Sequence, residues 1–201
     1  MKKFLILNTL LAIIAVILMG CSQPTSGSSD PFDDCTKTTD KIEYSNGTWT
    51  INYTISGKSS GYSYIEEDTI KALASSSSYL FTSGTSKITM KTAEVLGDDY
   101  NSYKALSDTE KEQVQNTFLE LLKYQIRSTG IGSITDASMN DDNIVFKLAL
   151  SDSYLRTWQR ALNPENLPRN TEIKTNSNKT KYVLTVPQSD GTKLKYYISK
   201  D

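Results

Sequence analysis

Residues 108–127 carry the strongest helical pattern of the chain, and this pattern limits the folds that the chain can adopt. Ser107 and Glu110 match a capping box, in which each side chain bonds a backbone N–H at the helix start. Gly130 and Gly132 follow the last turn and are expected to end the helix. The apolar positions form one stripe along the segment, made of Val114, Phe118, Leu121 and Leu122 together with Gln125. A long helix with a single apolar stripe packs that stripe on another layer, and we expect this layer to be a sheet.

The segment from residue 41 to 55 has the pattern of a β-hairpin. Asn46-Gly47 suits a two-residue type I′ turn, because both residue types tolerate positive φ. With Ser45 opposite Thr48, the apolar residues of both arms fall on one face: Ile42, Tyr44, Trp49, Ile51, Tyr53 and Ile55. The sequence therefore predicts an antiparallel hairpin at the start of the domain.

Further strands are predicted in the second half of the chain and just before residue 92. Residues 85–92 and 143–150 alternate apolar and polar side chains, as half-buried strands do. Residues 179–186 and 193–199 predict a second hairpin, joined through Asp190-Gly191. Both faces of this second hairpin carry apolar residues, so its inward face stays open.

Two shorter helices complete the predicted elements. Apolar residues recur at helical spacing in 65–74 and in 153–162, and residues 56–63 predict the loop before the first of them. We therefore predict an α+β domain with an antiparallel or mixed sheet of about five to seven strands and two or three packed helices.

The first 20 residues have the three-part composition of an export signal. Lys2 and Lys3 precede the mostly apolar run 4–18, and the small residue Gly20 follows it. This run is shorter than the roughly 20 apolar residues that a membrane-spanning helix needs. We therefore expect residues 1–20 to be a signal peptide and not a membrane-spanning anchor.

The residues Leu18-Met19-Gly20-Cys21 resemble the lipobox of bacterial lipoproteins. The resemblance implies that residues 1–20 are removed, that the Cys21 thiol carries a diacylglyceryl group, and that the new amino terminus is acylated. Each buried CH₂ contributes about 0.8 kcal/mol, so two or three acyl chains hold a protein on a membrane stably. Ser22 stands where Asp would favour retention at the inner membrane, so the resemblance implies the outer membrane of the cell envelope.

Residues 21–40 predict a flexible tether between the lipid and a single domain at residues 41–201. The segment is rich in Ser, Thr, Asp and Pro and contains one aromatic residue, Phe32, so it buries little apolar surface. A random coil of this length reaches about 25 Å. With Cys21 lipidated, Cys35 has no partner for an intramolecular disulfide, and either an incidental role or intermolecular pairing is open to it.

The composition excludes several kinds of site. The chain contains no histidine, which removes Ser-His-Asp and Cys-His catalysis and imidazole zinc sites. It also lacks a G-x-S-x-G motif, a phosphate-binding glycine loop and a C-x-x-C pair. We therefore predict no catalytic residues, no metal and no cofactor.

Charge is distributed unevenly along the predicted mature chain. Residues 21–152 carry 11 Lys and Arg against 19 Asp and Glu, a net of −8, whereas residues 153–201 carry 9 against 4, a net of +5. If they share one face, the basic residues of the C-terminal part are a candidate docking surface for an acidic partner: Arg156, Arg160, Arg169, Lys179, Lys181, Lys193 and Lys195. The alternative is that these lysines alternate along exposed strands and deter edge-to-edge association.

Clusters of acidic and polar residues give weak indications of a metal site or a hydrolase site. Oxygen side chains alternate at Asp136, Ser138, Asn140 and Asp142 as in a calcium loop, but Asp141 and Lys147 replace the glycine and glutamate of that loop. An ordinary polar turn is favoured there. The adjacent carboxylates Glu66-Glu67, Asp98-Asp99 and Asp141-Asp142 point apart on any regular element, so a hydrolase would need a pair assembled from separate loops.

Aromatic residues suggest binding. Four tyrosines are expected in loops or at helix approaches, where they suit a recognition surface, although partial burial in a sheet is the alternative: Tyr62, Tyr64, Tyr100 and Tyr103. Gly47-Thr48-Trp49 is similar to the G-x-W of lipocalins over three residues, but the helix at 108–127 interrupts the strand meander of such a barrel.

Taken together, these features predict a lipid-anchored envelope protein with a non-catalytic binding domain. Its expected partners are the membrane, through Cys21, and a protein or anionic glycan, with no nucleic acid. A lipocalin-like small-ligand carrier and, third, an envelope hydrolase are the alternatives.

Overall fold

A computed structural model describes residues 31–59 and 61–201. The predicted signal peptide and the predicted lipidation site, Cys21, lie outside these residues. The described elements in chain order are β1 (Lys37–Thr39), β2 (Gly47–Ser59), β3 (Tyr62–Ala74), β4 (Tyr79–Lys91), α2 (Thr92–Leu96), η1 (Gly97–Asp99), α3 (Tyr100–Lys104), α4 (Asp108–Thr129), β5 (Gly132–Met139), β6 (Asn143–Leu150), α5 (Asp152–Ala161), η2 (Pro164–Asn166), β7 (Glu172–Thr175), β8 (Lys181–Pro187) and β9 (Lys193–Lys200).

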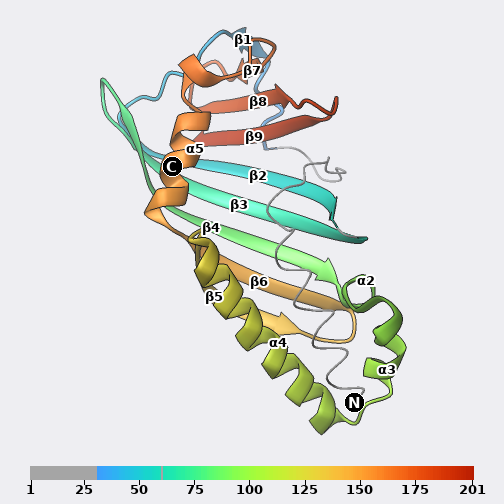
Figure 1. Cartoon of the computed structure of the whole chain (residues 1–201). Helices are drawn as coiled ribbons and strands as arrows, with labels where there is room; N and C mark the ends of the chain where they lie inside the picture. The colour runs from blue at the N-terminus through green and yellow to red at the C-terminus, as the bar shows by residue number, and fades with distance from the viewer. Residues whose placement is uncertain (1–30, 60) are drawn as a thin grey trace.

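The described strands form one antiparallel sheet of nine strands in the order β1-β7-β8-β9-β2-β3-β4-β6-β5. Two helices, α4 and α5, lie on the same side of it (Figure 1). The predicted α+β class with an antiparallel sheet is confirmed, but the sheet is larger than the five to seven strands expected. Strands β1 and β5 stand at its two edges, so the described sheet is open and forms no closed barrel.

The centre of the sheet is a ladder of three long strands. β2 and β3 pair over their whole length, from Gly47 opposite Ala74 to Ser59 opposite Tyr62, and β4 pairs along the other edge of β3. The predictions of a loop at 56–63 and a helix at 65–74 are wrong. Pairing on both edges satisfies the backbone groups of β3 along the strand, and this tertiary pairing overrides the local helical spacing of its apolar residues.

The predicted hairpin around Asn46-Gly47 is also wrong. A type I′ turn needs positive φ at both central residues, and only Gly47 has it, at +135°. β2 pairs with β3 on one edge and with β9 on the other, so no edge is left for residues 42–45. Tyr44 nevertheless packs on Trp49, with ring centroids 4.9 Å apart.

The C-terminal strands form the other half of the sheet. β8 and β9 pair as the predicted second hairpin, and their inward residues are Tyr182, Leu184, Val186, Leu194, Tyr196 and Ile198. β1 pairs with β7, and Cys35 just before it is buried. The sheet therefore begins within the segment 21–40 that the sequence suggested as a tether.

Two of the predicted helices, 108–127 and 153–162, are present in the structure, whereas α2 and α3 were not predicted. Helix α4 begins with the predicted capping box, in which the Glu110 carboxylate accepts the backbone N–H of Ser107 at 3.2 Å and its hydroxyl at 2.9 Å. It ends at Gly130, which has the left-handed conformation common after helices. The predicted strand 143–150 and helix 153–162 correspond to β6 and α5. No helix in the described part of the chain has the length and apolar character needed to cross a membrane.

Alternation along the strands defines the core. Every second residue of β2 from Trp49 to Ile55 is buried on the inward face of the sheet, namely Trp49, Ile51, Tyr53 and Ile55, as the sequence predicted. The same face of β6 buries Ile144, Phe146, Leu148 and Leu150. On β3, however, this inward face also carries the carboxyl groups of Glu66 and Asp68. Acidic side chains are rarely buried in a core unless they are paired.

Candidate functional site

Helix α5 is fixed to the sheet by its own capping residue and by two leucines. The Ser151 hydroxyl accepts the backbone N–H of Tyr154 at 3.2 Å, a regular N-cap. Leu155 and Leu162 are buried against the sheet. One side of the helix therefore faces the core, and the opposite side is exposed.

Gln159 joins α5 to the edge of β4. Its amide oxygen accepts the backbone N–H of Phe81 at 3.1 Å, and its amide nitrogen donates to the carbonyl of Tyr79 at 3.2 Å. The Tyr79 hydroxyl returns a hydrogen bond of 3.0 Å to the carbonyl of Leu162. These three bonds hold the tip of the β3–β4 hairpin against the C-terminal half of α5.

A pocket of about 650 Å³ lies at this junction and is called the α5 pocket below. Its lining residues come from the hairpin tip and from α5: Ser77, Ser78, Tyr79, Leu80, Arg156, Gln159, Arg160 and Asn163. Arg156 and Arg160 are one helical turn apart and exposed. Within residues 31–59 and 61–201 neither guanidinium forms an ion pair, although most lysines of these residues do. The α5 pocket thus presents two unpaired planar cations, which suit a carboxylate or phosphate.

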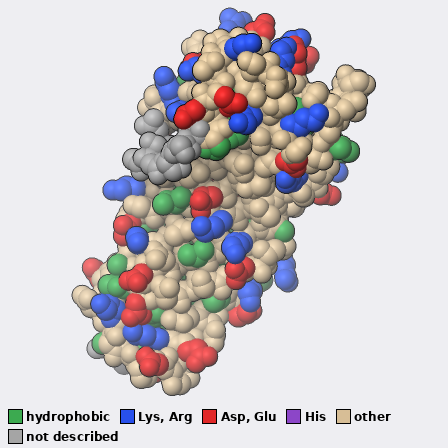
Figure 2. All heavy atoms as spheres, turned by 180° about the vertical axis from the view of Figure 1, so that it is seen from behind, with side chains coloured by type: hydrophobic (Ala, Val, Ile, Leu, Met, Phe, Trp, Pro, Cys, Tyr) green, Lys and Arg blue, Asp and Glu red, His purple; other side chains and the backbone are tan. Residues whose placement is uncertain are grey.

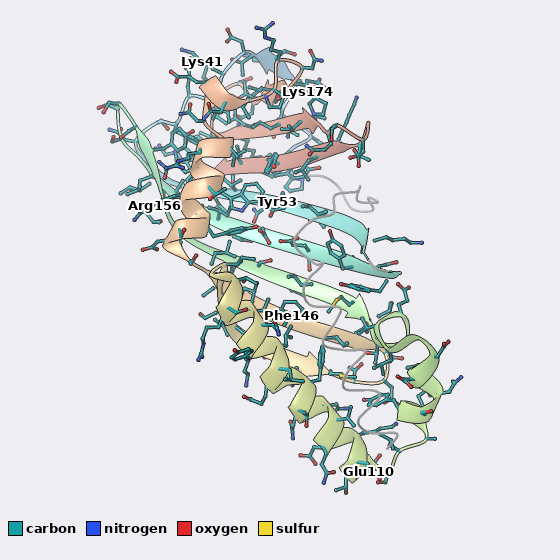
Figure 3. All side chains as sticks on the ribbon, in the orientation of Figure 1. Lys41, Tyr53, Glu110, Phe146, Arg156 and Lys174 are labelled. Carbon is teal, nitrogen blue, oxygen red and sulfur yellow. The ribbon has the colours of Figure 1, made fainter. Side chains whose placement is uncertain are left out.

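A second group of polar residues lies beneath the other side of α5. We call it the acid–aromatic cluster, and it consists of Tyr53, Glu66, Asp68, Ser86, Tyr154 and Trp158. Asp68 is opposite Tyr53 on β2 and opposite Ser86 on β4, so these three residues form one row across the sheet. Figure 3 shows Tyr53 on the sheet beside α5, with Arg156 on the other side of the helix.

Hydrogen bonding in the acid–aromatic cluster is incomplete. The Tyr53 hydroxyl donates to Oδ2 of Asp68 at 2.5 Å. Oδ1 of Asp68 and Oγ of Ser86 are buried and have no well-formed hydrogen bond within the described chain. Asp68 is 2% exposed and Ser86 is 3% exposed, whereas Glu66 is partly open to solvent.

Burial sets the electrostatics of the cluster. It raises the pKa of Glu66 from its ordinary value of 4.5 to about 7, and the negative charge of Asp68 adds to this rise. Burial also raises the pKa of Asp68. The Ser86 hydroxyl lies close to both carboxyls and lowers their pKa values, but its effect is smaller than that of burial. Burial, followed by the charge of Glu66, raises the pKa of Tyr154 to about 12.

Rings pack beside these carboxyls. The Trp158 ring lies 4.8 Å from that of Tyr53 and 6.0 Å from that of Tyr196, and the Tyr154 ring lies 6.3 Å from Trp158. Two acidic groups and several aromatic faces therefore meet between β3 and α5. Sequence reasoning missed this site, because it treated 65–74 as a helix and looked only at adjacent carboxylates.

The basic residues of the C-terminal part do not share one face. Lys193 and Lys195 alternate with the inward residues of β9 and so point away from α5, which carries Arg156 and Arg160. Lys179 pairs with Glu43 at 2.6 Å, and Lys181 pairs with Asp34 at 3.2 Å. Figure 2 shows the molecule from behind, where cationic and anionic side chains are interspersed. The idea of a single basic docking face is therefore wrong, because strand alternation separates the lysines from the helix arginines.

The four selected tyrosines do not form an exposed patch. Tyr62 and Tyr64 are buried on β3, and Tyr103 is buried in α3. Tyr100 is half-buried, and its hydroxyl donates to the carbonyl of Asp141 at 3.1 Å. These four tyrosines are therefore buried or half-buried in the sheet and its helices, which was the alternative to a recognition surface.

The calcium-like spacing at 136–142 spans a strand and a turn. Asp136 lies on β5 and pairs with Lys147 at 3.1 Å. Oδ1 of Asn140 accepts the backbone N–H groups of Asp142 and Asn143 at 2.9 and 2.8 Å. Residues 140–142 therefore form the polar turn that the sequence favoured, while Asp136 and Ser138 lie on β5.

Comparison with models of known protein families, with curated proteins and with solved structures found no match to this chain. Both candidate sites, the α5 pocket and the acid–aromatic cluster, involve residues of α5.

Proposed function

We propose that this protein is a lipid-anchored component of the cell envelope whose domain binds an anionic glycan without catalysis. The lipobox at Leu18–Cys21 supports the anchor, and Ser22 supports the outer membrane as its location. The α5 pocket supports the ligand class. The observation that carries this proposal is the pair Arg156 and Arg160, which line one pocket and have no carboxylate partner in the described chain.

The chemistry of the α5 pocket fits a charged sugar. Guanidinium groups bind carboxylates in a bidentate manner, and this geometry suits the acidic group of a uronic acid. Tyr79 and Leu80 contribute apolar surface for the C–H face of a sugar ring, and Asn163 contributes an amide for its hydroxyls. A volume of about 650 Å³ is in the range of ordinary ligand sites, which span about 300–1,000 Å³.

Calorimetric titration of the full chain in neutral detergent tests the ligand class. The probe is a tetragalacturonic acid, and its methyl ester is the control, because the ester has the same sugars without the charges. We expect the acid to bind at low ionic strength and the ester to bind at least tenfold more weakly. Affinity for the acid falls at physiological salt, since exposed charges are screened beyond about 8 Å there.

Matched double variants locate the binding. Arg156→Gln with Arg160→Gln removes two charges from the α5 pocket, whereas Lys193→Gln with Lys195→Gln removes two from the opposite face of the sheet. We expect the arginine double variant to lose at least tenfold in affinity and the lysine double variant to change by less than twofold. Equal losses in the two variants, or equal binding of acid and ester, would contradict the proposal.

A further inference from the structure

Glu66 and Asp68 project from alternate positions of β3 and therefore share its inward face. Glu67 lies between them in sequence but faces outward, where it pairs with Lys87 at 2.7 Å. Neither inward carboxyl has a Lys or Arg partner within the described residues. Two acidic groups thus lie at a largely buried position without a counter-ion, which is costly unless a positive group or a proton compensates them.

Unsatisfied oxygen atoms point to a missing partner. Tyr53 donates to one oxygen of Asp68, but the other oxygen and the neighbouring Ser86 hydroxyl have no well-formed hydrogen bond. Buried polar oxygens are nearly always bonded in folded proteins. A donor with more than one N–H, placed beside Glu66 and Asp68, would satisfy both carboxyls and Ser86 together.

The aromatic side chains specify the kind of donor. Trp158 and Tyr154 of α5 stand beside the carboxyls, and the Tyr53 ring contacts Trp158 from below. Ring faces attract organic cations and supply no ligand atoms to a metal ion. Glu66 is partly exposed whereas Asp68 is buried, so Glu66 is the first of the two carboxyls that a ligand from solvent would contact.

We propose that the acid–aromatic cluster binds the ammonium group of a small organic amine. Glu66 and Asp68 accept its N–H groups, the Ser86 hydroxyl oxygen accepts another, and Trp158 and Tyr154 cover the adjoining methylene groups. This site lies on the opposite side of α5 from the Arg156 and Arg160 pair and does not depend on the proposed glycan binding.

Titration with n-butylammonium chloride tests the proposal, and n-butanol is the neutral control of nearly the same shape. The reporter is the indole N–H signal of Trp158 in ¹H–¹⁵N NMR spectra of the full chain in neutral detergent, assigned with Trp158→Phe. We expect saturable shifts with the amine and none with the alcohol at the same concentrations. Equal shifts with both, or none with the amine at 50 mM, would overturn the proposal.

Variants at alternate positions of β3 provide a matched control. Glu66→Gln with Asp68→Asn keeps the size of the side chains and removes both inward charges, whereas Glu67→Gln removes the outward charge between them. We expect at least a tenfold loss of amine binding in the first protein and less than a twofold change in the second. A similar loss in both proteins contradicts the site.

The pH dependence of the wild-type protein tests the same site without any substitution. The groups that face Glu66 are Asp68 on its own strand, Tyr53 on β2, Ser86 on β4 and Tyr154 on α5. Tyr53 and Tyr154 stay protonated at neutral pH, since burial raises their pKa values. Ionisation of Glu66 near pH 7 therefore strengthens amine binding severalfold between pH 5.5 and 8.5. Affinity that is constant over this range would contradict the role of Glu66.

Discussion

Gly84 of β4 lies directly beneath Leu155 of α5, and a Cβ atom at this glycine would come within 2.8 Å of Cδ2 of Leu155. Cδ1 of Leu150 would lie 2.9 Å from the same Cβ atom. The absence of a side chain at Gly84 therefore lets α5 approach the sheet closely. This approach brings Tyr154 and Trp158 to the carboxyls of β3 and positions the α5 pocket.

Gly84→Ala is expected to destabilise the protein by about 1–3 kcal/mol, because the added methyl group overpacks a filled core. The measurement is chemical unfolding in urea, with Ser83→Ala, an exposed neighbour on the same strand, as the control. In a Leu155→Ala background the same glycine substitution is expected to cost less, since the nearest clashing atom is gone. Additive losses in the double variant would show that Leu155 does not limit the space at Gly84.

Stability is expected to fall as pH rises from 5 to 8. The pKa of Glu66 is raised to about 7 in the folded protein from an ordinary 4.5, so the folded state holds a proton that the unfolded chain has already lost. The stabilisation is complete below about pH 4.5 and is lost as pH rises toward 7. Asp68 acts in the same direction. The expected decline is about 1–3 kcal/mol in the free energy of unfolding, measured with urea at each pH.

Glu66→Gln separates this effect from other titrations. The chain has no histidine, so few other side chains titrate between pH 5 and 8. We expect the variant to show a smaller decline over this range, because only Asp68 still contributes to it, and to be more stable than the wild type at pH 8. Glu67→Gln, on the outward face, is expected to keep the wild-type decline. A decline of equal size in the Glu66 variant would assign it to another group.

Cys21→Ala is expected to release the protein from membranes while the domain stays folded. In the proposed lipid anchor this residue carries the acyl chains, and its replacement would remove the apolar groups that hold the protein on a bilayer. The measurement is the distribution of the protein between membrane and soluble fractions after a high-salt wash, with circular dichroism to confirm folding. Membrane retention equal to that of the wild type would contradict the lipid anchor.

Local patterns predicted the elements whose residues satisfy their own backbone. The capping box at Ser107 and the stop at Gly130 occur as the sequence indicated, because helix hydrogen bonds are made within about four residues. Of the predicted apolar stripe Val114, Phe118 and Leu122 are buried, while Ile126, which the prediction left out, is buried in place of Leu121 and Gln125. The alternation in 143–150 also predicted β6 correctly, since its apolar residues follow the strand period closely.

The same reasoning failed where pairing over long distances determines the structure. The apolar residues Ile65, Ile70, Leu73 and Ala74 fit a helix, but 65–74 is a strand whose register with β2 and β4 leaves Ile65 and Leu73 exposed. The missed signal for the acid–aromatic cluster was the spacing of Glu66 and Asp68. Residues two apart share a face of a strand but not of a helix. The assignment of 65–74 to a helix therefore placed Glu66 and Asp68 on different faces and hid their proximity.

The sequence by itself excluded histidine-dependent sites and determined the helices with strong caps, because residue types and local hydrogen bonds decide these features. The lipid anchor at Cys21 stays a prediction from the sequence. Only the tertiary structure decided which carboxyls, rings and arginines come together. Strand register and the position of α5 depend on contacts between residues far apart in the chain, such as Tyr53 with Trp158 and Gly84 with Leu155. Such contacts produce no periodic pattern in either of the two segments that they join. They form only when the sheet has assembled, so the position of the site could not be predicted from local sequence.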